Sequence, residues 1–173
     1  MLTFADFEDL KEYVGRDDLP YSVAASRALE SATALIQNYT GQSFWSATST
    51  VTLSVRGSCV FLPQLPVISV ASVVSDAVSV TWTNYTSGIL RLTSTHGEVV
   101  TVTYTHGYAT IPDDVQTVCA SAAARGMENP TMSARESIGA YNIAYAQSGS
   151  NLGAGIYLTE AERGVLNRHR VTV

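Results

Sequence analysis

The sequence predicts an α+β fold: a helical frame of about four helices carrying an inserted antiparallel β-sandwich or barrel-like subdomain. Three observations support it. Apolar residues recur at helical spacing near both ends of the chain, and short alternating segments separated by turn residues fill its middle. A strand also passes directly into a helix within residues 99–130. The expected divisions are helices in 1–42, the β subdomain in 43–110, a frame helix in 111–130, an assembly arm in 131–157 and a C-terminal helix with a basic tail in 158–173.

The stretch 99–130 connects the two kinds of structure. Its first residues alternate valine or tyrosine with threonine up to Gly107, as a half-buried strand does. Pro112 then fits the first turn of a helix, and Asp113 and Asp114 place negative charge at the positive end of the helix dipole. Asn129-Pro130 ends this helix.

Two further helices are predicted before residue 43. Residues 3–14 form a short helix with Thr3 and Asp6 as an approximate capping box, and residues 20–40 form a longer one beginning at Pro20. The longer helix and the helix after Pro112 both carry small apolar faces, so we expect them to pack closely. The residues of this contact are Ala25, Ala28, Ala32, Val115, Val118 and Ala122.

Residues 43–110 are rich in serine, threonine and valine and contain only four charged residues. Their alternating apolar segments predict antiparallel strands separated by turns. Before the strand at 99–105, the expected strands are Val51 to Val55, Cys59 to Leu62, Val67 to Val74, Val78 to Trp82 and Ile89 to Leu92.

Residues 131–157 contain a short alternating segment, Tyr141, Ile143 and Tyr145, within a stretch that is otherwise small or polar. This pattern predicts a strand that pairs with another chain, so that the arm becomes ordered on assembly. Aromatic residues are enriched at protein interfaces, which favours packing between subunits. Stacking on carbohydrate or nucleic acid is the alternative.

The C-terminal helix is predicted to begin at Thr159-Glu-Ala-Glu162 and to end in a basic tail. Six acidic residues lie within the first twenty residues, whereas the last eleven contain no acid. The tail either contacts an acidic partner or DNA, or only stabilises the negative end of its helix dipole. Its cationic side chains are Arg163, Arg168, His169 and Arg170.

No pattern of catalytic or metal-ligating residues stands out, so we expect no enzyme activity, cofactor or metal. Asp113-Asp114 could act as a carboxylate pair, but a role at the start of the helix is favoured. His106 lies far in sequence from any partner nucleophile, so we expect a turn histidine bonded to the backbone. The two cysteines, Cys59 and Cys119, have no CxxC spacing, which predicts free, buried and inert thiols.

The bulk properties narrow the function classes. A net charge of −5 is unusual for a general nucleic-acid binder, and a charged fraction of only 14% suits a surface covered by other copies of the chain. The N-terminus lacks the basic and apolar regions of a signal peptide, and no segment approaches the length of a membrane span. We therefore expect a soluble protein made in a cytoplasm.

The block Tyr-Thr-His-Gly-Tyr-x-x-Ile-Pro-Asp-Asp-Val at 104–115 resembles the head-to-tail adaptor, or connector, proteins of tailed bacteriophages. The resemblance extends to Leu62-Pro-Gln-Leu-Pro-Val67, to Glu136-Ser-Ile-Gly139 with the following tyrosines, and to Leu158-Thr-Glu-Ala-Glu162. Smaller members of that family are nearly all helical, so the β-rich segment departs from them.

The resemblance implies a non-enzymatic subunit of a ring, twelvefold in this family, beneath the portal. Such a ring extends the DNA channel and connects the capsid to the next neck or tail component. Its partners are further copies of the chain, the portal, that component, and the packaged DNA, which passes without sequence-specific binding. The location is the virion neck, after synthesis in the host bacterial cytoplasm, with no membrane association. The alternative is an oligomeric β-sandwich recognition module that binds a glycan or a host surface.

Overall fold

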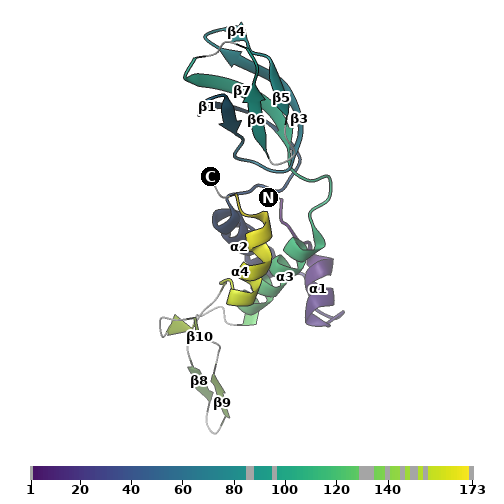
Figure 1. Cartoon of the computed structure of the whole chain (residues 1–173). Coiled ribbons are helices and arrows are strands. Elements are labelled where there is room, and N and C mark those ends of the chain that lie inside the picture. Colours follow the sequence, from purple (N-terminus) through teal and green to yellow (C-terminus); the bar gives the residue numbers. More distant parts are fainter. Residues whose placement is uncertain are drawn as a thin grey trace. The chain divides into compact units, whose positions relative to one another are not determined.

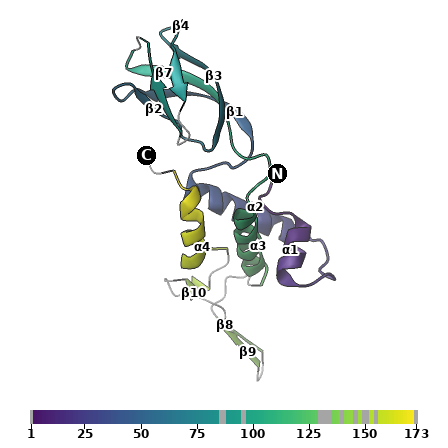
Figure 2. The ribbon, with the colours of Figure 1, turned by 45° about the vertical axis from the view of Figure 1, so that its right-hand side comes forward.

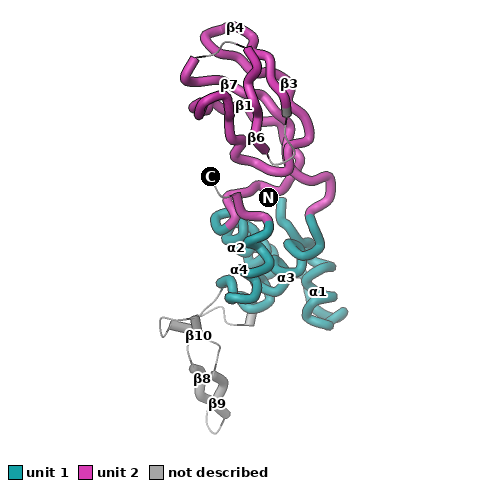
Figure 3. The backbone as a smooth tube through the Cα atoms, in the orientation of Figure 1, with its two compact units in different colours: residues 1–39, 112–168 teal, residues 40–111, 169–173 magenta. Residues whose placement is uncertain are grey.

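The computed structural model describes residues 2–84, 88–94, 97–128, 135–138, 141–144, 147–148, 152–153 and 156–171. The chain forms two compact units, shown in Figure 3. The helical unit consists of residues 1–39 and 112–168, and the β unit consists of residues 40–111 and 169–173.

Among its described residues the helical unit contains four helices, as predicted. They are α1 (Phe7–Val14), α2 (Val23–Thr40), α3 (Asp113–Glu128) and α4 (Glu160–Leu166), and a short 3-10 turn, Asn167–His169, follows α4. Helix α3 packs against α1 on one side and α4 on the other, and Figures 1 and 2 show it between them.

Helix α1 begins four residues later than predicted, because Asp6 rather than Thr3 is its N-cap. The Asp6 carboxylate accepts a hydrogen bond from the Asp9 backbone N–H at 2.9 Å, and the Asp9 carboxylate accepts one from the Asp6 N–H at 2.7 Å. The buried Phe4 precedes the helix, and its backbone N–H donates to Thr33 Oγ1 at 3.0 Å. Residues 3–6 therefore precede α1 rather than extend it, and Phe4 among them is hydrogen-bonded to α2.

Helix α2 contacts α3 through small side chains. Cys119 Sγ lies 3.5 Å from Thr33 Oγ1 and 3.9 Å from the Leu29 carbonyl oxygen. The thiol is free, and its burial raises its pKa despite the hydrogen bond between it and Thr33. All six residues named above for the helix contact are buried. The helix starts at Val23 rather than Pro20, so Tyr21 lies outside it and is 69% exposed.

The β unit contains two antiparallel sheets with one core. The first has the strand order β1 (Ala47–Ser54), β7 (Val99–His106), β3 (Val67–Ser75), β4 (Val78–Ser79). The second has the order β2 (Cys59–Phe61), β6 (Ile89–Leu92), β5 (Trp82–Asn84). Buried residues of both sheets form a single cluster, which is the packing of a sandwich. The sandwich prediction is confirmed, and the described strands form no closed barrel.

The predicted strand from Val78 to Trp82 is two strands in different sheets. Strand β4 pairs with β3, whereas β5 pairs with β6. Between them the Val80 N–H donates to the Val73 carbonyl at 2.9 Å, and its side chain is buried in the core. The alternating pattern continues through this corner because Val80 faces the core common to both sheets.

Strand β7 shows why valine and tyrosine alternate with threonine. Val100, Val102 and Tyr104 are buried, whereas the threonines between them form cross-strand pairs with β1. Their hydroxyl oxygens lie 2.9–3.1 Å apart in the pairs Thr48–Thr105, Thr50–Thr103 and Thr52–Thr101.

The end of β7 requires glycine at position 107. Gly107 has φ +95°, and a Cβ there would collide with the Trp45 carbonyl. The next residue, Tyr108, donates its N–H to the Phe44 carbonyl at 2.7 Å. His106, predicted to be a turn residue bonded to backbone, instead ends the strand, and its Nε2 lies 2.9 Å from Ser49 Oγ. That prediction was wrong because the strand runs one residue further than the predicted range of 99–105 and includes His106.

Within residues 131–157 the structure describes four short strands. Strands β8 (Arg135–Ile138) and β9 (Tyr141–Ala144) pair antiparallel, with Glu136 opposite Ile143, and β10 (Gln147–Ser148) pairs with β11 (Leu152–Gly153). The strand predicted at 141–145 is therefore confirmed for Tyr141–Ala144. The expectation that it pairs with another chain was wrong for this edge, because β8 of the same chain occupies it. Tyr145 lies outside the described residues.

Candidate assembly surface

The first turn of α3 uses its acidic residues as the sequence predicts. The Pro112 carbonyl accepts hydrogen bonds from the N–H groups of Val115 and Gln116 at 2.9 and 3.1 Å. Asp114 Oδ1 accepts another from Val115 at 2.9 Å, and Asp113 adds a second negative charge to this turn. Placed here, the two carboxylates stabilise the positive end of the helix dipole.

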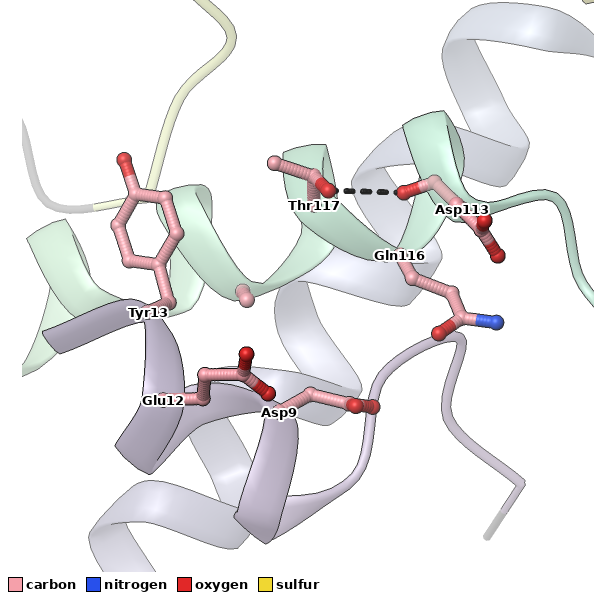
Figure 4. A pocket seen from close by; sticks show the side chains of 7 residues that line it. Asp9, Glu12, Tyr13, Asp113, Gln116 and Thr117 are labelled. Carbon is pink, nitrogen blue, oxygen red and sulfur yellow. Dashed lines mark hydrogen bonds between the residues drawn. The ribbon is translucent and has the colours of Figure 1, made fainter. Parts of the chain in front are cut away.

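An acidic groove lies between α1 and α3 (Figure 4). Its volume is about 510 Å³. Asp9, Glu12 and Tyr13 come from α1, and Asp113, Gln116, Thr117 and Ala120 come from α3. Asp9 is engaged in the α1 cap, whereas within the described parts of the chain no lysine or arginine forms an ion pair with Glu12 or Asp113. Three carboxylates at one groove favour a cationic partner.

A second, mainly apolar groove of about 310 Å³ lies next to it. Helix α4 contributes Ala161, Glu162 and Val165, and α3 contributes Val118 and Ser121. Tyr13 and Thr117 line both grooves. The two grooves therefore form one surface across α1, α3 and α4 with an acidic part and an apolar part. We call it the three-helix surface.

A buried ion pair joins α3 to α4. Arg125 Nη2 and Nη1 lie 2.8 and 3.0 Å from the two carboxylate oxygens of Glu162, so the pair is bidentate. Arg125 Nη2 also donates to the Tyr157 carbonyl at 2.7 Å, and the guanidinium lies 4.9 Å from the Tyr157 ring centre. The side chains of Arg125 and Glu162 are only 22% and 12% exposed.

Further hydrogen bonds hold the Glu162 carboxylate. Ser121 Oγ donates at 2.7 Å, and the Thr159 N–H and hydroxyl donate at 2.8 and 2.9 Å. Burial raises the pKa of Glu162, but the bonds from Arg125, Thr159 and Ser121 outweigh it, so the pKa is lowered. Arg125 lies near the end of α3 and Tyr157 just before α4, so the network fastens both ends of the segment between them. We call it the arm clamp.

Sequence reasoning missed the arm clamp. Glu162 stood out only as part of the α4 start, where Thr159 does form a capping box with it. Arg125 is a single cation in an alanine-rich helix, and 36 intervening residues separate it from Glu162. Arg125 itself was the one sequence feature that indicated such a contact. It is a cation on a helix face otherwise composed of small residues, and a buried charge needs a partner.

The predicted interface residues fall in different places. Arg163 and Arg168 are exposed, and Arg163 forms a long 3.8 Å ion pair with the exposed Glu160. Arg170 is exposed as well. The His169 ring instead packs within the β unit, 5.5 Å from the Phe44 ring centre and 6.4 Å from that of Tyr108. The backbones of Tyr141 and Ile143 lie in β9.

Two classes of feature are absent from the part of the chain that the structure describes. Its histidines, cysteines and acidic residues form no group of three that could hold a metal ion. None of its helices has the length and apolar character needed to cross a membrane.

The sequence model of a family described as "HCP: Head completion protein" matches residues 3–122, which is more than two thirds of the chain. The chain belongs to the head completion protein family. The resemblance to phage head-to-tail connectors is thereby confirmed at the level of the family. The matched range includes residues 43–110, the predicted β-rich segment.

Two solved structures share the fold of this chain. "Neck of native GTA particle computed with C12 symmetry" matches with a TM-score of 0.57 and 18% identity, covering 100% of this chain and 97% of the other. "Neck of empty GTA particle computed with C6 symmetry" matches with a TM-score of 0.57 and 13% identity, covering 96% and 89%. At these identities the likeness shows a shared fold. No curated protein matches.

Proposed function

We propose that the chain is a structural subunit of a phage head-to-tail neck, where copies of it form a ring beneath the portal. In this role it extends the DNA channel and connects the capsid to the next neck or tail component, without catalysis and without a cofactor. The family match over residues 3–122 is the observation that carries the proposal.

The fold likeness supports the ring. Both matched structures are necks computed with cyclic symmetry, C12 in one and C6 in the other, and each aligns with nearly the whole of this chain. A cyclic ring needs two different surfaces on each subunit, one for each neighbour. Twelve copies is the number we propose, after the C12 neck.

The interface residues remain part of the proposal. Arg163, Arg168 and Arg170 are exposed cations that suit acidic surfaces of neighbouring copies or of the portal. Tyr141, Ile143 and Tyr145 are proposed to contact a neighbouring copy or the portal from the arm, whose two ends the arm clamp fastens. Packaged DNA is proposed to pass through the channel without base-specific contacts.

The test is the mass and shape of the purified chain, alone and mixed with the portal protein of the same virus. Mass photometry should find an assembly twelve times the 18.5 kDa mass of the chain, and negative-stain images should show a ring with an open centre that binds the portal. A chain that stays monomeric at every concentration and does not bind the portal would contradict the proposal. Binding of a monomer to a glycan array would favour the recognition-module alternative.

A further inference from the structure

Helices α1 and α4 lie on opposite sides of α3 (Figures 1 and 2). The acidic groove is lined by α1 and α3, the exposed Arg163 is in α4, and the exposed Arg168 is in the 3-10 turn that follows α4. A head-to-tail repeat of this unit brings the α4 side of one copy next to the α1 side of the following copy. This order of helices is therefore suited to a cyclic assembly.

We propose that the acidic groove between α1 and α3 receives the basic end of α4, Arg163 and Arg168, from the neighbouring copy of the chain. The inference rests on the ring proposed above and names the contact that closes it. Glu12 and Asp113 are the main acceptors, since Asp9 already serves the α1 cap. Gln116 and Thr117 offer further polar groups on the α3 wall, as Figure 4 shows.

Charge complementarity favours a second copy as the occupant. No acidic residue follows Glu162, so the charged side chains beyond it are all cationic. Arg168 is exposed, and within the described residues no ion pair is found for it. The Arg163–Glu160 pair is long and exposed, so exchanging it for a carboxylate in the groove costs little.

The shape of the three-helix surface supports the same occupant. The apolar groove continues the acidic one past Tyr13 and Thr117. A partner element can therefore place cations in the acidic groove and apolar side chains in the adjacent apolar groove. In α4 itself Val165 lines the apolar groove of its own chain, so the exposed charges that a neighbouring copy presents are Arg163 and Arg168.

The test uses charge reversal on the full-length chain. Glu12→Lys changes the groove at a side chain with no hydrogen bond among the described contacts, near the C-terminal end of α1, where a lysine suits the helix dipole. Arg163→Glu with Arg168→Glu changes the opposite surface. Asp17→Lys, at an exposed turn outside the groove, and Arg56→Glu, on the β unit, are the matched controls.

Each reversal should raise the apparent dissociation constant of ring assembly at least about tenfold, measured by mass photometry at low salt, because like charges then face each other. The controls should leave it unchanged. The Glu12→Lys chain mixed with the Arg163→Glu, Arg168→Glu chain should again form rings, since every contact in an alternating ring then joins opposite charges.

The outcomes separate this contact from the ring itself. Wild-type rings whose assembly is unaffected by both reversals, or reversed chains that do not recover on mixing, overturn the groove contact and leave the ring intact. A wild-type chain that never assembles overturns the contact and the proposed ring together. Circular dichroism of each variant checks that a loss of assembly is not a loss of fold.

Discussion

Replacing Arg125 by alanine should destabilise the helical unit strongly. The change removes both hydrogen bonds to Glu162, the bond to the Tyr157 carbonyl and the contact with the Tyr157 ring. It leaves a carboxylate that is only 12% exposed without its cation. Removing one partner of a buried ion pair costs about 3–5 kcal/mol, and we expect about 3 kcal/mol because Ser121 and Thr159 still bind the carboxylate.

The measurement is urea unfolding followed by the helical circular dichroism signal. With an m-value of about 2 kcal/mol per M, a loss of about 3 kcal/mol lowers the unfolding midpoint by about 1.5 M. Arg163→Ala is the matched control, because its ion pair with Glu160 is long and exposed and should contribute less than about 1 kcal/mol. If Arg125→Ala shifts the midpoint no more than Arg163→Ala does, the arm clamp does not stabilise the unit.

The ion pair between Arg125 and Glu162 also predicts that the stability of the fold depends on pH. The pKa of Glu162 is lowered in the folded chain, so the folded state binds fewer protons than the unfolded state in the acidic range. This contribution to stability is complete above the ordinary glutamate pKa and is lost as the pH falls through the lowered pKa. Glu162→Gln should therefore be less stable at neutral pH and should show a flatter decline in stability on acidification. An acid decline identical to that of the wild type would contradict this assignment.

Three further predictions concern packing and the end of β7. Replacing Ala32 or Ala122 by leucine should cost about 1–3 kcal/mol through overpacking, and unchanged melting temperatures for both would show that these positions tolerate larger side chains. Gly107→Ala should cost more than about 1 kcal/mol, because φ is positive and the new methyl group meets the Trp45 carbonyl, and a wild-type urea midpoint would contradict this. Burial lowers the pKa of His106, so its contribution to the stability of the fold is present above the ordinary histidine pKa and is lost as the pH falls. His106→Gln should therefore reduce the difference in melting temperature between pH 7 and pH 5.

The α+β fold class could be predicted because it depends on local sequence patterns, and the structure shows the elements that these patterns predict. The alternation in β7 persists because one face of the strand is buried and the other carries threonine pairs. Helix α3 begins where Pro112 and the two aspartates predicted it, since the chemistry of a helix start is local. Such signals involve residues close in sequence, so the sequence alone displays them.

The predictions that failed depend on contacts between distant residues. Val80 alternates correctly with its neighbours, yet the strand divides there because its two halves pair with different partners. Phe4 lies within the predicted helix 3–14, but its backbone N–H bonds to Thr33 on α2 instead. The arm clamp joins residues on two helices, and no local pattern connects them.

The central claim is that copies of the chain form one ring of a cyclic neck. A reconstruction of the neck in intact virions tests this claim most directly. The density should show twelve copies in a single ring beneath the portal, each fitting the helical unit and the β unit, with α4 of one copy beside α1 of the next. A neck with no density for this chain, or copies placed singly on the outside of the capsid or tail, would contradict the claim.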